Sequence, residues 1–439
     1  MRTRLRSAAV GLSILSLCCL WRLAPLSGAA GPIELSVMGR RNATPTIAAE
    51  GQFVAVAWGG AEASGATDVF AAVSRDGGRA FAAPVRVNHI DADARVNGEQ
   101  PPYVALVRRA GREPVIVVVW TTKGANGTTL LQARSGDGGR SFSPAVLVPG
   151  TDAPGNRGWE AIAVEPGGRV DAVWLDHREL AHDPSMAASH HDHKGAGKRD
   201  GVAMAQKSKL FFASLDGEAA PRPVAGGVCY CCKTVLVSAG GALYAAWRHV
   251  YPGNLRDMAF TMSRDGGRTF APPLRVSEDQ WALEGCPDDG PAMTVDAQNR
   301  IHIVWPTLVS GATAGVEPNI ALFYAMSTDG KQFTPRVRIP TEGTPHHPRI
   351  TVGSDASLTV AWDELANGSR HVAIGRGTSD DGGRPRFHRE ALTSGGSSIY
   401  PAIAVASDGV VAAWTSGAST ASSIQVRRIA GSASAATRK

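Results

Sequence analysis

Residues 263–270 read SRDGGRTF, and near copies occur earlier in the chain, as SRDGGRAF at 74–81 and SGDGGRSF at 135–142. Weaker copies begin at Ser214, Ser327 and Ser379. In such a motif the Ser and Asp side chains can bond nearby backbone amides, the glycines permit positive φ, and the aromatic ring covers the turn. The motif therefore predicts a tight turn that recurs along the chain and has a structural role.

Seven tryptophans mark the same repeat, because each of them ends a short β-rich run such as FVAVAW at 53–58 or IHIVW at 301–305. They lie between 52 and 73 residues apart and are Trp58, Trp120, Trp174, Trp247, Trp305, Trp362 and Trp414. Between them, short apolar runs alternate with turns rich in Gly, Asn and Asp, which is typical of antiparallel strands joined by hairpins. An internal repeat of this kind predicts an all-β propeller.

The number of blades follows from the number of expected strands. Each of the first six repeats has four, whereas the last, from Tyr400 to about Arg428, has three. The segment IELSV at 33–37 is a strand without a repeat of its own, and pairing it with the last three would remove exposed strand edges. We therefore predict a single propeller of seven blades, with six as the alternative, whose blades begin near residues 43, 100, 157, 232, 290, 347 and 400.

The recurring turn resembles the Asp-box, or BNR repeat, of the sialidase superfamily. The resemblance implies a propeller in which these turns lie away from the catalytic face. Sialidases have six blades and hold the substrate carboxylate with three arginines near a Tyr nucleophile, a Glu and an Asp. Arg338-Ile339-Pro340 has the letters of the early arginine motif of that family but lies in a repeat strand of the fifth unit, while Arg40 and Arg41 stand early without the motif. The resemblance therefore covers the fold and not the catalytic pattern.

The N-terminus has the three-part layout of a secretory signal. Basic residues come first, an apolar stretch covers 8–20, and small residues occupy 27–30. The apolar stretch is shorter than the roughly 20 residues that span a bilayer, so we expect no transmembrane anchor. A secreted or periplasmic protein is expected, and lipoprotein processing at Cys18 is the less favoured alternative because Leu17 is bulky.

The rest of the chain is expected to form one domain. We assign 1–30 to the signal, 31–430 to the propeller with a His-rich insert at about 182–199, and 431–439 to a disordered tail. Removing the four arginines of the signal lowers the formal net charge from +6 to +2, which gives little support to nucleic-acid binding. A monomer is expected.

Function is expected on the face opposite the tight turns, where the connections are long and irregular and surround the central channel. Candidate ligand-binding residues on these connections are Asp176, His177, Arg178, His249, Tyr251, Trp281, His347 and Arg349. Candidate catalytic residues are Arg248, Arg256, Asp257, Glu284 and Tyr400. Two arginines with an acid near a channel mouth suit an anionic ligand such as a carboxylate, and the alternative is a network of salt bridges between loops.

All four cysteines that follow the signal lie on the same expected face, at Cys229, Cys231, Cys232 and Cys286. Disulfides are the favoured interpretation for an exported protein, and four cysteines allow three pairings. The alternatives are a metal site with copper or zinc, since thiolate and imidazole ligands suit both, and redox-active thiols. The histidines at 190–193 belong to a short tract that is typical of a solvated loop.

Two functions remain open from the sequence. The first is an exported propeller that binds a glycan, an extracellular protein or a metal on the Cys, Arg and His face. The second is an exo-acting glycoside hydrolase of sialidase type on an acidic sugar, with Arg248 and Arg256 holding the carboxylate and Asp257 or Glu284 in acid–base work. The two differ in whether three arginines converge beside a Tyr–Glu pair.

Overall fold

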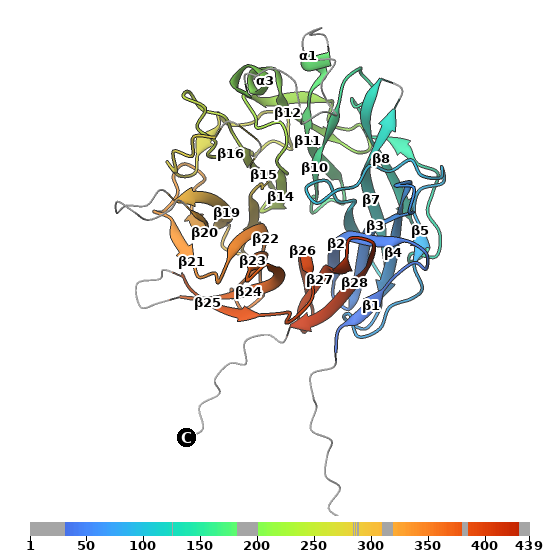
Figure 1. Ribbon diagram of the computed structural model, residues 1–439. Helices are drawn as coiled ribbons and strands as arrows, with labels where there is room; N and C mark the ends of the chain where they lie inside the picture. The colour runs from blue at the N-terminus through green and yellow to red at the C-terminus, as the bar shows by residue number, and fades with distance from the viewer. Residues whose placement is uncertain are drawn as a thin grey trace, which may run out of the picture. The chain divides into compact units, whose positions relative to one another are not determined.

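The computed structural model of the chain describes residues 31–124, 126–181, 201–283, 285, 287, 289–309, 319–379 and 385–429. The expected signal segment, the insert at about 182–199 and the expected tail at 431–439 lie outside these residues. Residues 32–439 form one compact unit. Within it, seven four-stranded antiparallel sheets follow one another around a ring, which confirms the seven-bladed propeller and rules out the six-bladed alternative (Figure 1).

The first six sheets are each built from four consecutive strands. Sheets one to three contain β2 (Arg41–Glu50), β3 (Phe53–Ala61), β4 (Thr67–Ser74) and β5 (Val85–Arg86), then β6 (Tyr103–Arg109), β7 (Arg112–Gly124), β8 (Gly127–Ser135) and β9 (Val146–Leu147), then β10 (Arg157–Val164), β11 (Val170–Asp176), β12 (Lys209–Ser214) and β13 (Arg222–Gly226). Sheets four to six contain β14 (Val235–Ala239), β15 (Ala242–Arg248), β16 (Met258–Ser263) and β17 (Leu274–Arg275), then β18 (Ala292–Val295), β19 (Ile301–Val309), β20 (Asn319–Ser327) and β21 (Val337–Ile339), then β22 (Thr344–Val352), β23 (Leu358–Ala366), β24 (Ser369–Ser379) and β25 (Pro385–Ala391).

The seventh sheet joins the two ends of the propeller. Its strands are β26 (Ser398–Ala406), β27 (Gly409–Ala418), β28 (Ala421–Ile429) and the N-terminal β1 (Ile33–Leu35). β1 runs antiparallel to β28, with Ile33 opposite Val426 and Leu35 opposite Ile424, and Figure 1 shows the blue β1 beside the red β28. Two short helices, α1 (Arg178–Ala181) and α3 (Gly201–Lys207), lie between β11 and β12. Among the described residues, no helix has the length and apolar character needed to cross a bilayer.

The seven repeat tryptophans all lie in the core, at 2% exposure or less. A buried indole N–H needs an acceptor, and several blades supply one from a polar residue two positions further along the strand. Trp174 donates to Asp176 at 3.0 Å, and Trp362 donates to Glu364 at 3.0 Å. The acids that follow these tryptophans therefore contribute to blade structure.

The Asp-box turn has the local hydrogen bonds that its residue types predict. In the copy at 263–270, the hydroxyl of Ser263 donates to Asp265 at 2.7 Å and accepts from the amide of Gly267 at 2.9 Å. Asp265 accepts from the amide of Thr269 at 2.9 Å. Gly267 has φ +79°, and a Cβ there would lie 2.2 Å from the ring of Phe212. The turn is therefore a packing element between blades, as expected.

Candidate functional site

The inner wall of the propeller is formed by the first strand of each sheet. Each of these strands contacts the first strand of the next sheet, and β26 contacts β2. In four of them the pairing register shifts, and a residue inside the shift has positive φ: Thr44 at 57°, Trp159 at 53°, His347 at 51° and Tyr400 at 55°. Positive φ is a genuine outlier for bulky residues, and bulges re-aim side chains. In these four blades the channel lining is thus a strained part of the first strand, and strained backbone clusters at functional sites.

Two His–Asp pairs lie side by side on this wall. His346 Nδ1 lies 2.6 Å from Asp289 Oδ2, and His347 Nδ1 lies 2.7 Å from Asp363 Oδ1. The backbone amide of His347 also donates to Asp289 at 2.8 Å. The ring of Tyr400 packs edge-on against that of His347, with centroids 4.5 Å apart, and its amide donates to Asp363 at 3.1 Å. Residues from blades five, six and seven thus form one polar cluster.

A buried lysine completes this cluster. Lys233 is 1% exposed, and its backbone amide donates to Glu99 Oε2 at 2.8 Å while its Nζ lies 3.8 Å from Glu99 Oε1. Burial lowers the pKa of Lys233 to about 8 and raises the pKa of Glu99, because burial disfavours both charged forms. Ligand atoms of Glu99, Asp289 and His347 come within 4.8 Å of one another, but the Lys233 ammonium already supplies a cation beside this group.

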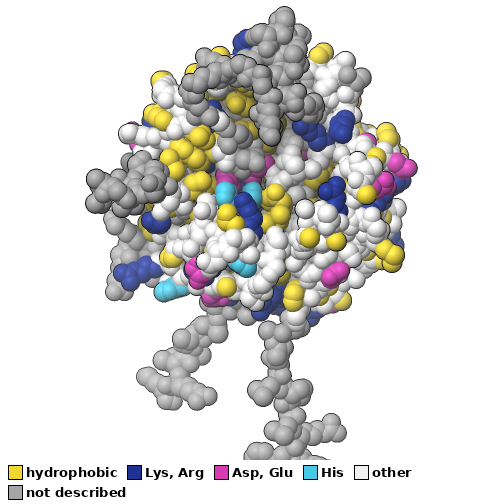
Figure 2. Space-filling model, in the orientation of Figure 1, with side chains coloured by type: hydrophobic (Ala, Val, Ile, Leu, Met, Phe, Trp, Pro, Cys, Tyr) yellow, Lys and Arg dark blue, Asp and Glu magenta, His cyan; other side chains and the backbone are white. Residues whose placement is uncertain are grey.

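Arg349 is the second cation of the wall, on β22. It is partly exposed, and among the described residues its one hydrogen bond runs from Nη1 to the Pro348 carbonyl at 3.4 Å. Its charge lowers the pKa of Lys233 and opposes the burial that raises the pKa of Tyr103 to about 12. Figure 2 shows His, basic and acidic side chains gathered at the centre of the ring. Arg349 therefore presents charged donors in a cluster that is otherwise paired internally.

Arg248, a predicted catalytic residue, is used differently. It is 1% exposed, and its guanidinium donates to the backbone carbonyls of Asp289, Arg256 and Pro306 at 2.8 to 3.0 Å. The face of the guanidinium lies 4.8 Å from the ring of Trp281. Arg248 and Trp281, both expected at the ligand, thus hold neighbouring connections together.

Arg256 and Asp257 also point into the protein. Arg256 donates from Nε to the Leu283 carbonyl at 2.8 Å and from Nη1 to Cys229 Sγ at 3.1 Å. Asp257 is 0% exposed, pairs with Arg275, and accepts from the amides of Gln280 and Trp281. Glu284 lies outside the described residues. The predicted catalytic set is therefore divided, with Tyr400 in the channel cluster and the two arginines bound to carbonyls or sulfur.

The remaining predicted ligand-binding residues lie on the connections around this wall. Asp176 pairs with Arg157 at 3.2 Å and Arg178 at 2.7 Å, and His177 packs against Trp159 with ring centroids 5.5 Å apart. His249 lies 4.5 Å from the ring of Tyr251. Burial lowers the pKa of His249 to about 4 and raises that of Tyr251 to about 12. The structure brings His347, Arg349 and Tyr400 together, whereas Asp176, Arg178 and His249 contact neighbouring strands and loops outside this cluster.

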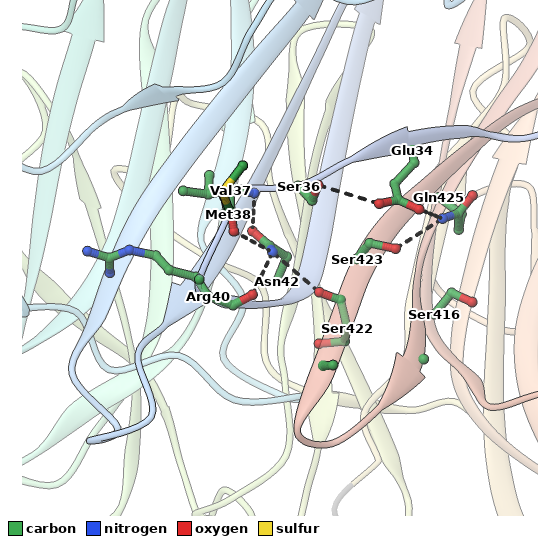
Figure 3. Close-up of a pocket in the computed structure, with 13 residues that line it drawn as sticks. Glu34, Ser36, Val37, Met38, Arg40, Asn42, Ser416, Ser422, Ser423 and Gln425 are labelled. Atoms are coloured by element: carbon green, nitrogen blue, oxygen red, sulfur yellow. Dashed lines mark hydrogen bonds between the residues drawn. The ribbon is translucent and has the colours of Figure 1, made fainter.

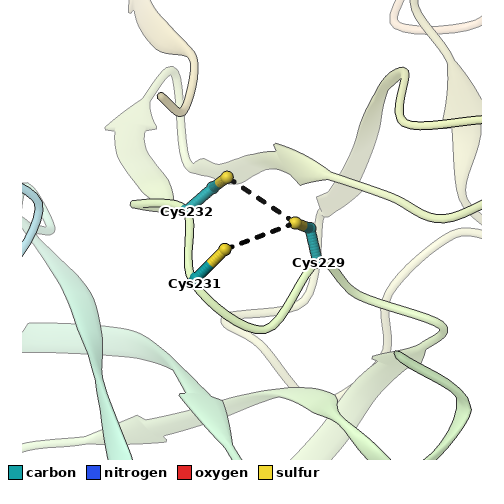
Figure 4. A group of neighbouring side chains, drawn as sticks. All are labelled: Cys229, Cys231 and Cys232. Atoms are coloured by element: carbon teal, nitrogen blue, oxygen red, sulfur yellow. Dashed lines mark hydrogen bonds between the residues drawn. The ribbon is translucent and has the colours of Figure 1, made fainter. Parts of the chain in front are cut away.

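The cysteine cluster corrects the expectation of disulfides for two of its members. Cys229 and Cys232 are free and buried, with their sulfurs 3.6 Å apart, well beyond the S–S bond length of about 2.05 Å. Cys231 is disulfide-bonded, its sulfur lies 3.8 Å from that of Cys229, and Figure 4 shows the Cys229 sulfur facing both of the others. Cys286 lies outside the described residues. Among the described residues, two thiols of this cluster are available as ligands, which is fewer than the four ligands of structural zinc sites.

One surface groove lies away from the channel, between β1 and the β27–β28 hairpin (Figure 3). Its central side chain, Asn42, accepts from the Val37 amide at 3.0 Å and from the Trp58 indole at 2.9 Å, and donates to the Arg40 and Ser422 carbonyls. These bonds attach the N-terminal segment to the blade behind it. The groove is therefore best explained as part of the junction of the two chain ends.

The residues that sequence reasoning missed as site residues share one position. Lys233, Asp289 and His346 each lie within a residue of an expected blade start, at 232, 290 and 347. The start of a blade is the part of the first strand that faces the channel mouth. Comparing the residues at the seven expected blade starts with one another, and not only the residues within each loop, would have found the cluster. Asp363 lies outside that position, because it reaches the cluster from β23.

Comparison with known proteins agrees on fold. An ulvan lyase bound to a GlcA–Rha3S unit is 11% identical, with 92% of this chain and 94% of that chain covered at a TM-score of 0.53. A Dyadobacter fermentans protein of unknown function is 12% identical, with 92% and 99% covered at 0.50. The Hadza microbial sialidase Hz136 is 13% identical, with 83% and 73% covered at 0.45. No family model and no curated protein matches the sequence. The chain is thus a seven-bladed β-propeller, and its likeness to these proteins is one of fold.

Proposed function

We propose that this chain is an exported ligand-binding propeller whose channel mouth holds an acidic glycan through Arg349, with the buried charge of Lys233 behind it. The observation that carries the proposal is the state of Arg349. Its guanidinium is partly exposed with one long internal hydrogen bond, whereas Arg248 and Arg256 donate to carbonyls or sulfur. A guanidinium can bind a carboxylate through two parallel hydrogen bonds, which makes Arg349 the best placed anion-binding group of the wall.

The neighbours of Arg349 suit a sugar acid. Lys233 adds a second positive charge, and His346, with 19% of its side chain exposed, presents a ring at the same wall. Tyr400 supplies an aromatic surface next to His347. Basic groups beside polar and aromatic surfaces match a carboxylate that is attached to a hydroxylated ring. The fold is shared with an ulvan lyase described with a glucuronate-containing unit, which is support by analogy only.

Binding is better supported than sialidase-type catalysis. That mechanism needs three arginines around one carboxylate beside a Tyr–Glu pair. Arg248 and Arg256, the two arginines expected to hold the carboxylate, instead direct their guanidinium groups to backbone carbonyls and to Cys229 Sγ. The hydrolase stays as the alternative. To support it, an experiment must detect cleaved sugar products in addition to binding.

The test is calorimetric titration of the mature protein with a uronate-bearing oligosaccharide and with its carboxyl-reduced, neutral counterpart. We expect binding of the acidic form, and at least tenfold weaker binding by Arg349→Gln. Arg338→Gln is the matched control, because Arg338 is exposed on β21 and should leave affinity unchanged. Equal affinity for the neutral sugar, or no effect of Arg349→Gln, would contradict the proposal. Release of new sugar ends in the same mixtures would favour the hydrolase.

Export is a separate part of the proposal, supported by the charge and hydropathy pattern of residues 1–30. We expect the protein from its native cells to be recovered outside the cytoplasm with a new N-terminus near Ala29 or Ala30. Intact mass and N-terminal sequencing of the fractionated protein measure both. A chain that keeps Met1 in the cytoplasmic fraction would show that the segment is not removed.

A further inference from the structure

We propose that Cys229, Cys231 and Cys232 form a thiol–disulfide exchange centre, in which Cys229 is the nucleophile and Cys232 is the resolving thiol. The geometry points to this function. The Cys229 sulfur faces both of the other cysteines, 3.6 Å from the sulfur of Cys232 and 3.8 Å from that of Cys231 (Figure 4). Cys229 and Cys232 have the Cys-x-x-Cys spacing of redox-active dithiols, and both are free.

The surroundings of Cys229 favour its thiolate. Arg256 is 0% exposed and donates to Cys229 Sγ at 3.1 Å, and its Nη2 has no hydrogen-bond partner in the described part of the chain. Arg248, also buried, donates its hydrogen bonds to neutral carbonyls. Two buried guanidinium charges therefore lack a carboxylate partner among the described residues, and Cys229 is the group beside them that can carry the opposite charge. A buried charge is costly unless it is paired.

Cys229 and Cys232 also differ in acidity, and thiol–disulfide exchange needs such a difference between the attacking and the resolving thiol. The hydrogen bond from Cys232, followed by the charges of Arg256 and Arg248, lowers the pKa of Cys229 below its usual range. Burial raises the pKa of Cys232, so that the proton of the pair stays there. A thiolate is the attacking species in exchange, and a neutral resolving thiol completes it.

The exchange can be written with all atoms and electrons assigned. The Cys229 thiolate attacks Cys231 Sγ, the bond from Cys231 to its partner sulfur breaks, and that sulfur leaves as a thiolate. Cys232 then loses its proton and attacks Cys229 Sγ, which forms the Cys229–Cys232 disulfide and releases Cys231 as a thiolate. Two electrons pass from the buried pair to the Cys231 disulfide, and the proton of Cys232 goes to a leaving thiolate. Because Cys231 is partly exposed, it is the sulfur through which an external dithiol or disulfide reaches the pair.

The test uses the mature chain, equilibrated across glutathione redox buffers, quenched with an alkylating reagent and mapped by fragment-ion mass spectrometry. We expect Cys229 and Cys232 to convert together between a doubly alkylated pair and an unalkylated disulfide, whose mass is 2 Da below that of the free dithiol. Cys232→Ser removes the resolving thiol, so Cys229 should then accumulate in a disulfide with Cys231 or with glutathione. Cys231→Ser is the matched control, and it should leave the Cys229–Cys232 disulfide in place while slowing its formation at least tenfold.

Two results would overturn the proposal. The first is that Cys229 and Cys232 stay reduced in every buffer while the protein remains folded, as expected for inert buried thiols. The second is one equivalent of copper or zinc, found by elemental analysis of the native protein, that blocks alkylation of both thiols. Arg256→Lys gives a second readout that does not depend on serine variants. It should slow alkylation of Cys229 at neutral pH at least severalfold, with a circular-dichroism spectrum like that of the original chain.

Discussion

The Asp-box turns and the channel wall satisfy their polar groups in opposite ways. In the turn at 263–270, Ser263 and Asp265 bond each other and the amides of the next few residues. In the channel, the amide of His347 reaches Asp289 across 58 positions of sequence, and Lys233 reaches Glu99 across 134. The turn recurs because its hydrogen bonds are local, so the same short sequence forms it in one blade after another. The channel does not repeat, because contacts such as those of His347 with Asp289 and of Lys233 with Glu99 join residues that are far apart in the sequence.

The difference in burial has an energetic consequence. Asp76 and Asp137 of the Asp-boxes lie at the surface, and hydrogen bonds from Ser74, and from Ser141 and Ser135, lower their pKa values. Asp289 and Asp363 are buried at 1% and 0% exposure. Removing a carboxylate from water is expensive, so the channel acids are retained only because histidines, Arg370 and backbone amides pair with them. Buried charges that the fold does not need are candidates for function.

The largest expected effect is the loss of a channel acid. Asp363→Ala removes the partner of His347, Arg370 and the Tyr400 amide at once, and leaves their donors buried. We expect the free energy of unfolding to fall by about 3–5 kcal/mol, as for other broken buried pairs. Urea unfolding followed by tryptophan fluorescence measures it. Asp91→Ala is the control, since the Asp91 side chain is 79% exposed and pairs only with Arg86 in the part of the chain described. Equal losses of unfolding free energy in the two variants would mean that buried channel acids and exposed acids contribute equally to stability.

The propeller could be predicted from sequence because its determinants are local and repeated. The spacing of Ser, Asp and Gly in the turn at 263–270, and the tryptophan that ends each run, need no knowledge of distant residues. Because the last of the seven repeats has one strand too few, the sequence also predicted that the IELSV segment pairs with it. In the structure β1 does run beside β28. The helices α1 and α3 were not expected, because they occur once, around an insert between β11 and β12, and no repeat announces them.

The site could be predicted only in part, and the arginines show why. Arg248 and Arg256 look like ligand-binding groups because their acceptors, the carbonyls of Asp289, Pro306 and Leu283, belong to the backbone. Every residue has a backbone carbonyl, so a sequence cannot reveal which carbonyls accept the hydrogen bonds of a given guanidinium. Arg349 was among the expected residues, but what distinguishes it from the other two is the small number of its bonds.

Another buried carboxyl group, that of Glu160, allows the two regions to be compared by the pH dependence of stability. It is buried on β10, accepts from the Thr121 hydroxyl at 3.0 Å, and burial raises its pKa from 4.5 to about 7. The folded protein therefore keeps the proton between pH 4.5 and 7 while the unfolded chain releases it. The stability from this group is present below pH 4.5 and is lost as pH rises through 7, by up to ~1.4 kcal/mol per pH unit.

Glu160→Gln should remove that dependence, because the amide keeps the size of the side chain and can still accept from Thr121. Urea unfolding at pH 5, 6, 7 and 8 measures the slope for both proteins. We expect the free energy of unfolding of the original chain to fall more steeply with pH than that of the variant. Parallel curves would mean that Glu160 ionises as freely as the surface acids of the turns.

A smaller effect is expected in the Asp-box itself. Ser263→Ala leaves the buried Gly267 amide without its acceptor at 2.9 Å, which should cost about 1–2 kcal/mol of unfolding free energy. Because the turn has a structural role and is not part of the proposed binding site, glycan affinity and the redox behaviour of Cys229 should stay the same. Parallel unfolding and calorimetric measurements on one preparation check both. A loss of affinity with unchanged stability would mean that the turns take part in binding.

The smallest effect is expected where two Asp-box turns meet at the surface. Arg75 of the first turn pairs with Glu113, and its Nη2 donates to the Gly138 carbonyl of the second turn at 2.9 Å. The two side chains are 41% and 39% exposed, so water and salt screen the pair, and exposed pairs contribute about 0–1 kcal/mol. A double-mutant cycle of Arg75→Ala and Glu113→Ala should give a coupling free energy below about 1 kcal/mol that shrinks further as salt is raised. A coupling as large as the loss in Asp363→Ala would show that surface and channel charges are equally important for stability, and that burial does not separate the two regions.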